Sequence, residues 1–209
     1  MDDKKIIDKK ADESILEIIN GKDTLLFVFG GMLLQFGLIP PFELLNFLQT
    51  TYEGKADYIY IVDKMQCWYH RGIKGKTKNI PETIEFLNSL IERKKYKKVV
   101  MAGISAGGYA SILFSSLCKK VDTSLSIIPQ TSIQSPTDKK YGDVTKFINE
   151  RVSYIVHGDK KDKSTYHSYN HVECLKKFKN IKIIDHERIS NLKILKKDGR
   201  LKTIFDEIL

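Results

Sequence analysis

The chain has 209 residues, 42% of them hydrophobic, which suits one folded domain and argues against extended disorder. Its net charge of +9 comes mostly from lysines scattered along the chain, so nucleic acid is not expected as a partner. Three widely spaced cysteines offer neither a disulfide framework nor a zinc pair. The charged N-terminus does not resemble a signal peptide, and no run approaches the ~20 apolar residues of a membrane span, so we expect a cytoplasmic protein.

Short apolar runs alternate along the chain with longer segments of helical periodicity, a pattern typical of a mostly parallel sheet covered by helices. The runs expected as strands are 24–31, 57–63, 97–103, 123–129, 151–158 and 181–185. The segments expected as helices are 40–52, 80–96, 106–120, 165–178 and the tail from Ile189. The sequence therefore predicts an α/β three-layer sandwich with a sheet of about six strands and helices on both faces.

This sandwich is expected to form a single domain over residues 1–209, with the least order at residues 1–12. The run SILEII, ahead of the first strand, fits two structures. It could pair as an antiparallel strand with residues 24–30, or it could end a helix.

The strongest motif is GISAGG, which lies between a buried strand pattern and an apolar helical pattern. It places Gly103, Ser105 and Gly107 in G-x-S-x-G spacing, with Gly108 as a further small residue. A serine at a sharp strand-to-helix turn needs small residues on both sides, and the amide of Ala106 would face an oxyanion formed at the serine. The alternative is a glycine-containing turn that binds phosphate or only packs, although the P-loop pattern is absent.

On this motif, and on the order of elements from about residue 24, the chain resembles the α/β-hydrolase superfamily, in particular compact microbial esterase-like proteins without a cap domain. The resemblance implies the chain order nucleophile, acid, base, with Ser105 as nucleophile. It implies His186 as general base, because this histidine follows the last predicted strand. It places the acid just beyond the strand 151–158, where Asp162 is preferred and Asp159 is the alternate.

A glycine-containing loop and an aromatic loop are both expected at the carboxyl-terminal edge of the sheet, where ligands bind in open α/β sheets. In the first, Gly31 and Met32 are candidates for the second oxyanion amide, although the glycines could serve only a tight turn. In the second, Trp68, Tyr69 and His70 either line the substrate pocket or seal an edge of the core.

The remaining histidines after the motif are not assigned a catalytic role. His157 ends a strand, and His167 and His171 share one helical face. The last two are spaced for metal, but the glutamate of an HExxH motif is missing, so neither a metal nor a cofactor is expected.

These residues predict a serine hydrolase that cleaves a carboxylic ester of a small molecule or glycan through an acyl-enzyme. An acyltransferase, a thioesterase or a peptidase would use the same residues. A non-catalytic binding protein is the alternative of another class, because a fold does not fix a function and the spacing of the acid is irregular.

Overall fold

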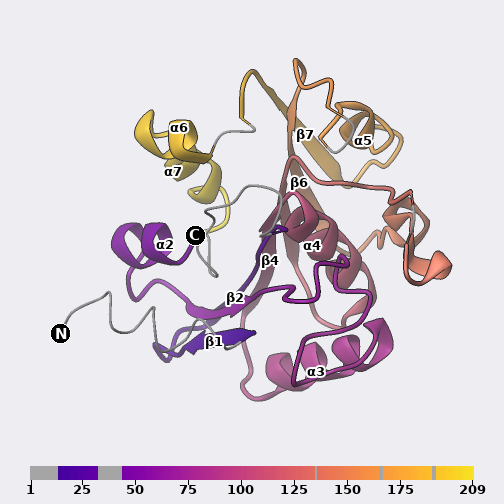
Figure 1. Cartoon of the computed structure of the whole chain (residues 1–209). Coiled ribbons are helices and arrows are strands. Elements are labelled where there is room, and N and C mark those ends of the chain that lie inside the picture. The colour runs from indigo at the N-terminus through magenta and orange to yellow at the C-terminus, as the bar shows by residue number, and fades with distance from the viewer. Residues whose placement is uncertain (1–13, 33–43, 135, 165–166, 190–191) are drawn as a thin grey trace.

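The computed structural model describes residues 14–32, 44–134, 136–164, 167–189 and 192–209 (Figure 1). The expectation for residues 1–12 and the beginning of the expected helix 40–52 lie outside the described residues.

A seven-stranded sheet forms the middle layer, in the order β1-β3-β2-β4-β5-β6-β7. The strands are β1 (Ile15–Ile18), β2 (Thr24–Phe29), β3 (Asp57–Ile61), β4 (Lys98–Ile104), β5 (Thr123–Ile127), β6 (Ser153–Asp159) and β7 (Ile181–His186). All neighbours from β3 to β7 are parallel. This confirms the predicted fold class.

Of the two structures considered for SILEII, the segment forms the strand, which is the edge strand β1. It is an antiparallel strand, but it pairs with β3, with Ile15 opposite Ile61, rather than with residues 24–30. The prediction of its partner was wrong because β2 is already paired on both sides, with β3 and with β4.

Helices cover both faces of the sheet (Figure 1). They are α2 (Leu45–Thr51), α3 (Ile80–Glu92), α4 (Ala106–Leu117), α5 (Asn170–Glu173), α6 (Leu192–Lys197) and α7 (Arg200–Phe205), with short 3-10 turns η1 (Lys139–Tyr141) and η2 (Val144–Phe147). Side chains from α3, α4 and α5 form a first core against one face. Those from α2, α6 and α7 form a second core against the other.

The expected helix over 165–178 is reduced to the four residues of α5. Two serine side chains bind the backbone just ahead of it. Ser164 Oγ accepts the amide of His167, and Ser168 Oγ accepts the amide of Asn170. Such local bonds offer the backbone an alternative to the helical pattern. The described residues between β6 and α5 therefore belong to no regular helix.

Among the described residues, no helix combines the length and apolarity that crossing a membrane requires.

Candidate active site

Ser105 occupies the turn between β4 and α4 in a conformation that side chains rarely adopt. Its φ is 55° and its ψ is −117°. Such a backbone costs about 1–3 kcal/mol and persists only where the surroundings enforce it. The half-buried side chain stands at the carboxyl end of the central strand β4, the edge at which open α/β sheets bind ligands.

The glycines around Ser105 are required by close approach of the backbone. A Cβ atom on Gly103 would lie 2.1 Å from the Gly107 carbonyl oxygen, and one on Gly107 would lie 2.1 Å from the Phe29 carbonyl oxygen. A Cβ on Gly108 would lie 3.1 Å from Pro129. The G-x-S-x-G spacing thus has the steric basis that the sequence predicts, and the turn packs directly on the end of β2.

The imidazole beside this serine belongs to His167. Its Nε2 lies 2.8 Å from Ser105 Oγ, across 62 residues of sequence. The histidine expected there, His186, instead places its Nε2 2.8 Å from Nδ1 of His157. The structure therefore corrects the assignment of His186.

The position of His186 in the sheet explains this correction. The last strand was expected to end at residue 185, but β7 includes His186, whose Cα is paired with that of Asp159. Because residues two apart share a face of a strand, His186 faces the same side as Ile184, which packs on the second core. The helix α4 that follows Ser105 covers the opposite face. No local sequence signal points to His167, whose spacing from His171 indicates only a shared helical face.

Among neighbouring charged groups, Asp162 has the largest influence on the pKa of His167. Burial lowers the pKa of His167, the Asp162 carboxylate raises it, and His171 lowers it, so that the pKa lies below its ordinary value. The Asp162 carboxylate also accepts the Ser164 amide at 2.8 Å, which ties it to the loop that carries His167.

The other candidate acids have structural partners. Asp159 accepts the amide of Lys161 at 3.0 Å and the amide of Ile189 at 2.8 Å. Asp185 accepts the hydroxyl of Tyr169 and pairs with Lys160. The Asp159 carboxylate therefore joins the end of β6 to the segment that follows β7, because it accepts a backbone amide from each.

Backbone amides border the serine on two sides. Ala106 is the first residue of α4, where amide groups have no carbonyl partner within the helix. Gly31 and Met32 follow β2, whose end lies against Gly107.

The backbone of Gly30, just ahead of them, is held by hydrogen bonds at both its amide and its carbonyl. Its amide donates to the Ile61 carbonyl at 2.8 Å, and its carbonyl accepts the Tyr69 hydroxyl at 2.9 Å. In a trans peptide the carbonyl and the following amide point in opposite directions, so the Gly31 N–H points away from Tyr69.

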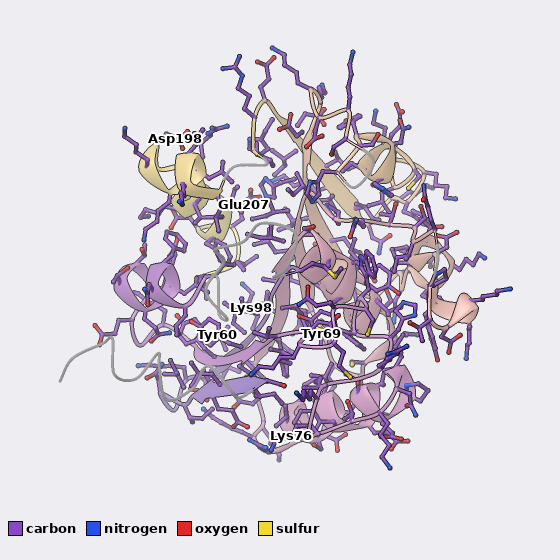
Figure 2. All side chains as sticks on the ribbon, viewed as in Figure 1. Tyr60, Tyr69, Lys76, Lys98, Asp198 and Glu207 are labelled. Carbon is purple, nitrogen blue, oxygen red and sulfur yellow. The ribbon has the colours of Figure 1, made fainter. Side chains whose placement is uncertain are left out.

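Two of the three residues expected at the substrate are interior residues. Tyr69 is 0% and His70 is 4% exposed, and Tyr69 lies among the packed side chains of the first core (Figure 2). His70 Nδ1 accepts the Asp138 amide at 3.1 Å, and its Nε2 lies 2.8 Å from the Tyr109 hydroxyl. Both were predicted with the alternative that they seal the core, and their burial favours that alternative.

Trp68 is half-buried, and its indole N–H donates to the Gln130 side-chain oxygen. Its ring packs against the first core. The structure therefore places the tryptophan at the border of that core, next to the loop that follows β5.

A buried carboxylate shapes the loop that carries these rings. Asp63, 1% exposed, accepts the amides of Met65, Cys67 and Tyr69 at 2.7–3.1 Å. The chain wraps around it with positive φ at Gln66, Trp68 and Tyr69. The loop thereby places the Tyr69 hydroxyl against the carbonyls of Gly30 and Ile61, at 2.9 and 3.1 Å.

No protein-family model matches the sequence, and no curated protein matches it either. Solved structures do match. An α/β serine hydrolase homologue from Coxiella burnetii is similar with a TM-score of 0.63 and 12% identity, over 93% of this chain and 91% of that one. The fluorophosphonate-binding serine hydrolase FphF of Staphylococcus aureus is similar with a TM-score of 0.58 and 10% identity, over 90% and 85%.

An esterase of Pyrococcus furiosus is similar with a TM-score of 0.56 and 13% identity, over 92% of this chain and 86% of that one. At such low identity the likeness concerns the arrangement of the backbone, which is common to all these chains.

Proposed function

Because the chain has the α/β-hydrolase fold, we propose that it is a serine hydrolase that cleaves carboxylic esters through an acyl-enzyme on Ser105, with His167 as general base. The observation that carries the proposal is the 2.8 Å approach of His167 Nε2 to Ser105 Oγ at a strained strand-to-helix turn. A serine hydroxyl becomes a useful nucleophile only when a neighbouring base takes its proton. The structural likeness to an esterase and to fluorophosphonate-binding hydrolases supports this reaction class.

In the first half of the reaction, Ser105 Oγ attacks the acyl carbon while its proton moves to His167 Nε2. The lowered pKa of His167 keeps the imidazole neutral, and therefore basic, near neutral pH. The oxyanion of the tetrahedral intermediate is stabilised by the amides of Ala106 and of Gly31 or Met32. When the bond from the acyl carbon to the alcohol oxygen breaks, His167 returns the proton to the departing alkoxide.

In the second half, water attacks the acyl-enzyme and His167 takes its proton. Ser105 Oγ leaves as the acid is released, and it recovers a proton from the imidazolium. Asp162 acts as the orienting acid in this proposal, because its negative charge favours the imidazolium that forms twice in each cycle.

The test compares two histidine variants with matched chemistry. We expect Ser105→Ala to abolish labelling by a fluorophosphonate probe and turnover of p-nitrophenyl acetate. His167→Gln should lower kcat/KM by about 10³-fold or more, whereas His186→Gln should stay within a fewfold of the native enzyme. Circular dichroism of each variant checks that the fold is kept.

The opposite ranking of the two histidine variants would overturn His167 as the base. Folded native protein that neither labels with the probe nor hydrolyses the ester would overturn the hydrolase proposal as a whole.

A further inference from the structure

A cavity of about 580 Å³ lies beside the loop that carries His167. Ser164 and Ser168 contribute to its wall, and these residues flank His167 in the chain. Ser164 Oγ also accepts the His167 amide at 3.1 Å. The cavity therefore adjoins the loop that carries the proposed base, and its opposite wall includes Thr131 and Ser132 from the segment after β5.

Five side-chain hydroxyl groups of the described residues line the cavity. They belong to Thr131, Ser132, Thr145, Ser164 and Ser168. Among the described residues that line the cavity, no side chain is a plain hydrocarbon, and the one aromatic ring is the imidazole of His171. Pockets that hold acyl chains are lined mainly by apolar groups, so this cavity suits a ligand rich in hydroxyl groups.

The cavity also carries excess positive charge. Lys163 and Lys177 contribute two positive charges, and Asp143 contributes one negative charge. The Asp143 carboxylate already accepts the amide and hydroxyl of Thr145, at 3.0 and 2.7 Å.

Neither cavity lysine is neutralised by a carboxylate within the described residues, although Lys177 Nζ lies 5.2 Å from the centre of the Phe178 ring. The adjacent Lys161 and Lys176, by contrast, pair with glutamates. Two ammonium groups at the rim of a hydroxyl-lined cavity favour an anionic ligand.

The far wall is built from backbone and side-chain hydrogen bonds within the chain. Ser132 pairs with Asp143 in an antiparallel bridge, and the Val144 amide donates to the Thr131 carbonyl at 2.9 Å. The Thr131 amide donates to His171 Nδ1 at 3.2 Å, which joins this wall to α5. A wall that is already ordered does not have to be ordered by the ligand when it binds.

We propose that this cavity binds the alcohol part of the ester, and that this part is a sugar carrying a negative charge, either a carboxylate or a phosphate. The inference rests on the proposed function, because it takes the bond to this alcohol to be the one that Ser105 cleaves. The released sugar leaves with the proton from His167, and the acyl group stays on Ser105 until water removes it.

The first experiment compares O-acetylated glucuronate, O-acetylated glucose and p-nitrophenyl acetate as substrates. The native enzyme should prefer the charged sugar ester over the neutral one by about tenfold in kcat/KM, as two partly exposed charge contacts allow. The variant Lys163→Gln/Lys177→Gln should lose this preference, measured as the ratio of kcat/KM for the two sugar esters. The control Lys95→Gln/Lys179→Gln changes the net charge equally at exposed residues outside the cavity and should keep the preference.

A second experiment measures binding without catalysis. Glucuronate and glucose 6-phosphate are titrated into Ser105→Ala protein by NMR, and the tighter of the two identifies the charged group. Binding should weaken about tenfold when the two cavity lysines are also replaced by glutamine.

The two experiments separate this inference from the proposed function. Hydrolysis of p-nitrophenyl acetate with no preference for the charged sugar ester, and with no binding of either sugar anion, overturns the cavity inference alone. Lysine-dependent binding of a sugar anion by protein that lacks all esterase activity supports the ligand class and overturns the hydrolase proposal.

Discussion

His167 experiences opposing influences that set the pH at which it can act as a base. Burial and the nearby His171 lower its pKa, and Asp162 raises it. A general base works in its unprotonated form, so kcat/KM rises as the pH increases through the pKa of the free enzyme. With this pKa below the ordinary value of about 6.5, the acidic limb should have its midpoint below pH 6.5.

Asp162→Asn tests which carboxylate acts on this base. Removing a charge that raises the pKa of His167 should move the acidic limb to lower pH, and it should also lower the maximal rate because the imidazolium loses a stabilising charge. A pH–rate profile with p-nitrophenyl acetate measures both effects. An unmoved limb would remove Asp162 from its proposed role.

We expect Tyr69 to act as a positioning residue in this site. Its hydroxyl binds the Gly30 carbonyl, and the Gly31 amide on the same peptide is a candidate for the oxyanion contact. Tyr69→Phe keeps the ring in the core but frees the peptide to rotate. We expect kcat to fall by about tenfold with KM nearly unchanged, because an oxyanion contact is stronger in the transition state than in the bound substrate. If kcat of the variant fell at each temperature only in proportion to the loss of folded protein, the role of Tyr69 would be purely structural.

The residues of the site differ in how far a sequence can predict them. Ser105 is predicted because its requirements are local, since Gly103 and Gly107 lie two positions away on either side. His167 is not, because its contact spans 62 residues and depends on where a loop places it. His186 has the expected position in the chain but lies inside a strand, on the face opposite α4.

At the scale of elements, the loop after β3 is organised by one buried carboxylate. Asp63 accepts three amides, and an asparagine would present an NH₂ group to some of them. Asp63→Asn should therefore lower the free energy of unfolding by about 2–3 kcal/mol, the usual range for bonds to a charged group. Urea unfolding measures the loss.

Asp23→Asn provides the control for this variant. Asp23 forms an exposed ion pair with Lys97, at 2.7 Å, and its loss should change the stability little. A similar loss in both variants would contradict a special role for Asp63.

Most strands are predicted correctly because a buried parallel strand is a continuous apolar run, as in Thr24–Phe29. The helix expected over 165–178 is wrong because apolar spacing alone does not register the serine side chains that bind its backbone. The partner of β1 is also not encoded locally, since an apolar run does not specify the edge to which it adds.

At the scale of the whole molecule, the described histidines make the fold sensitive to acid. His157 is 1% exposed, and burial together with the charges of His186 and Lys182 lowers its pKa to about 3. Its Nε2 lies 3.6 Å from Glu207, next to α7 (Figure 2). An unfolded histidine has a pKa of about 6.5, so below that pH the unfolded chain binds a proton that the folded chain does not.

The stability should therefore fall as the pH decreases from about 6.5 toward 3, with a contribution from His157 of at most about 1.4 kcal/mol per pH unit. His157→Gln should be less stable at neutral pH but should lose stability less steeply over this range. Thermal unfolding followed at several pH values compares the two slopes. Parallel curves for the native protein and the variant would contradict this prediction.

The overall architecture follows from the alternation of strand and helix patterns, whereas the pairing of distant side chains does not. The 2.8 Å contact between His157 and His186 joins the last two strands in a way that neither segment of sequence indicates. His157 lies near the end of β6 and His186 is the last residue of β7, and only the register of β6 against β7 brings their rings together.

The histidine that approaches Ser105 comes from the connection after β6, ahead of the edge strand β7 and the helices α6 and α7. The groups proposed to move protons are thus encoded before the last strand begins. The terminal segment could then diverge, or be exchanged for another segment that shields the same face, without altering the order of chemical steps. In this chain the residues proposed for proton transfer and those that line the cavity all precede β7, which makes the region from β7 onward the more suitable place for grafts and fusions.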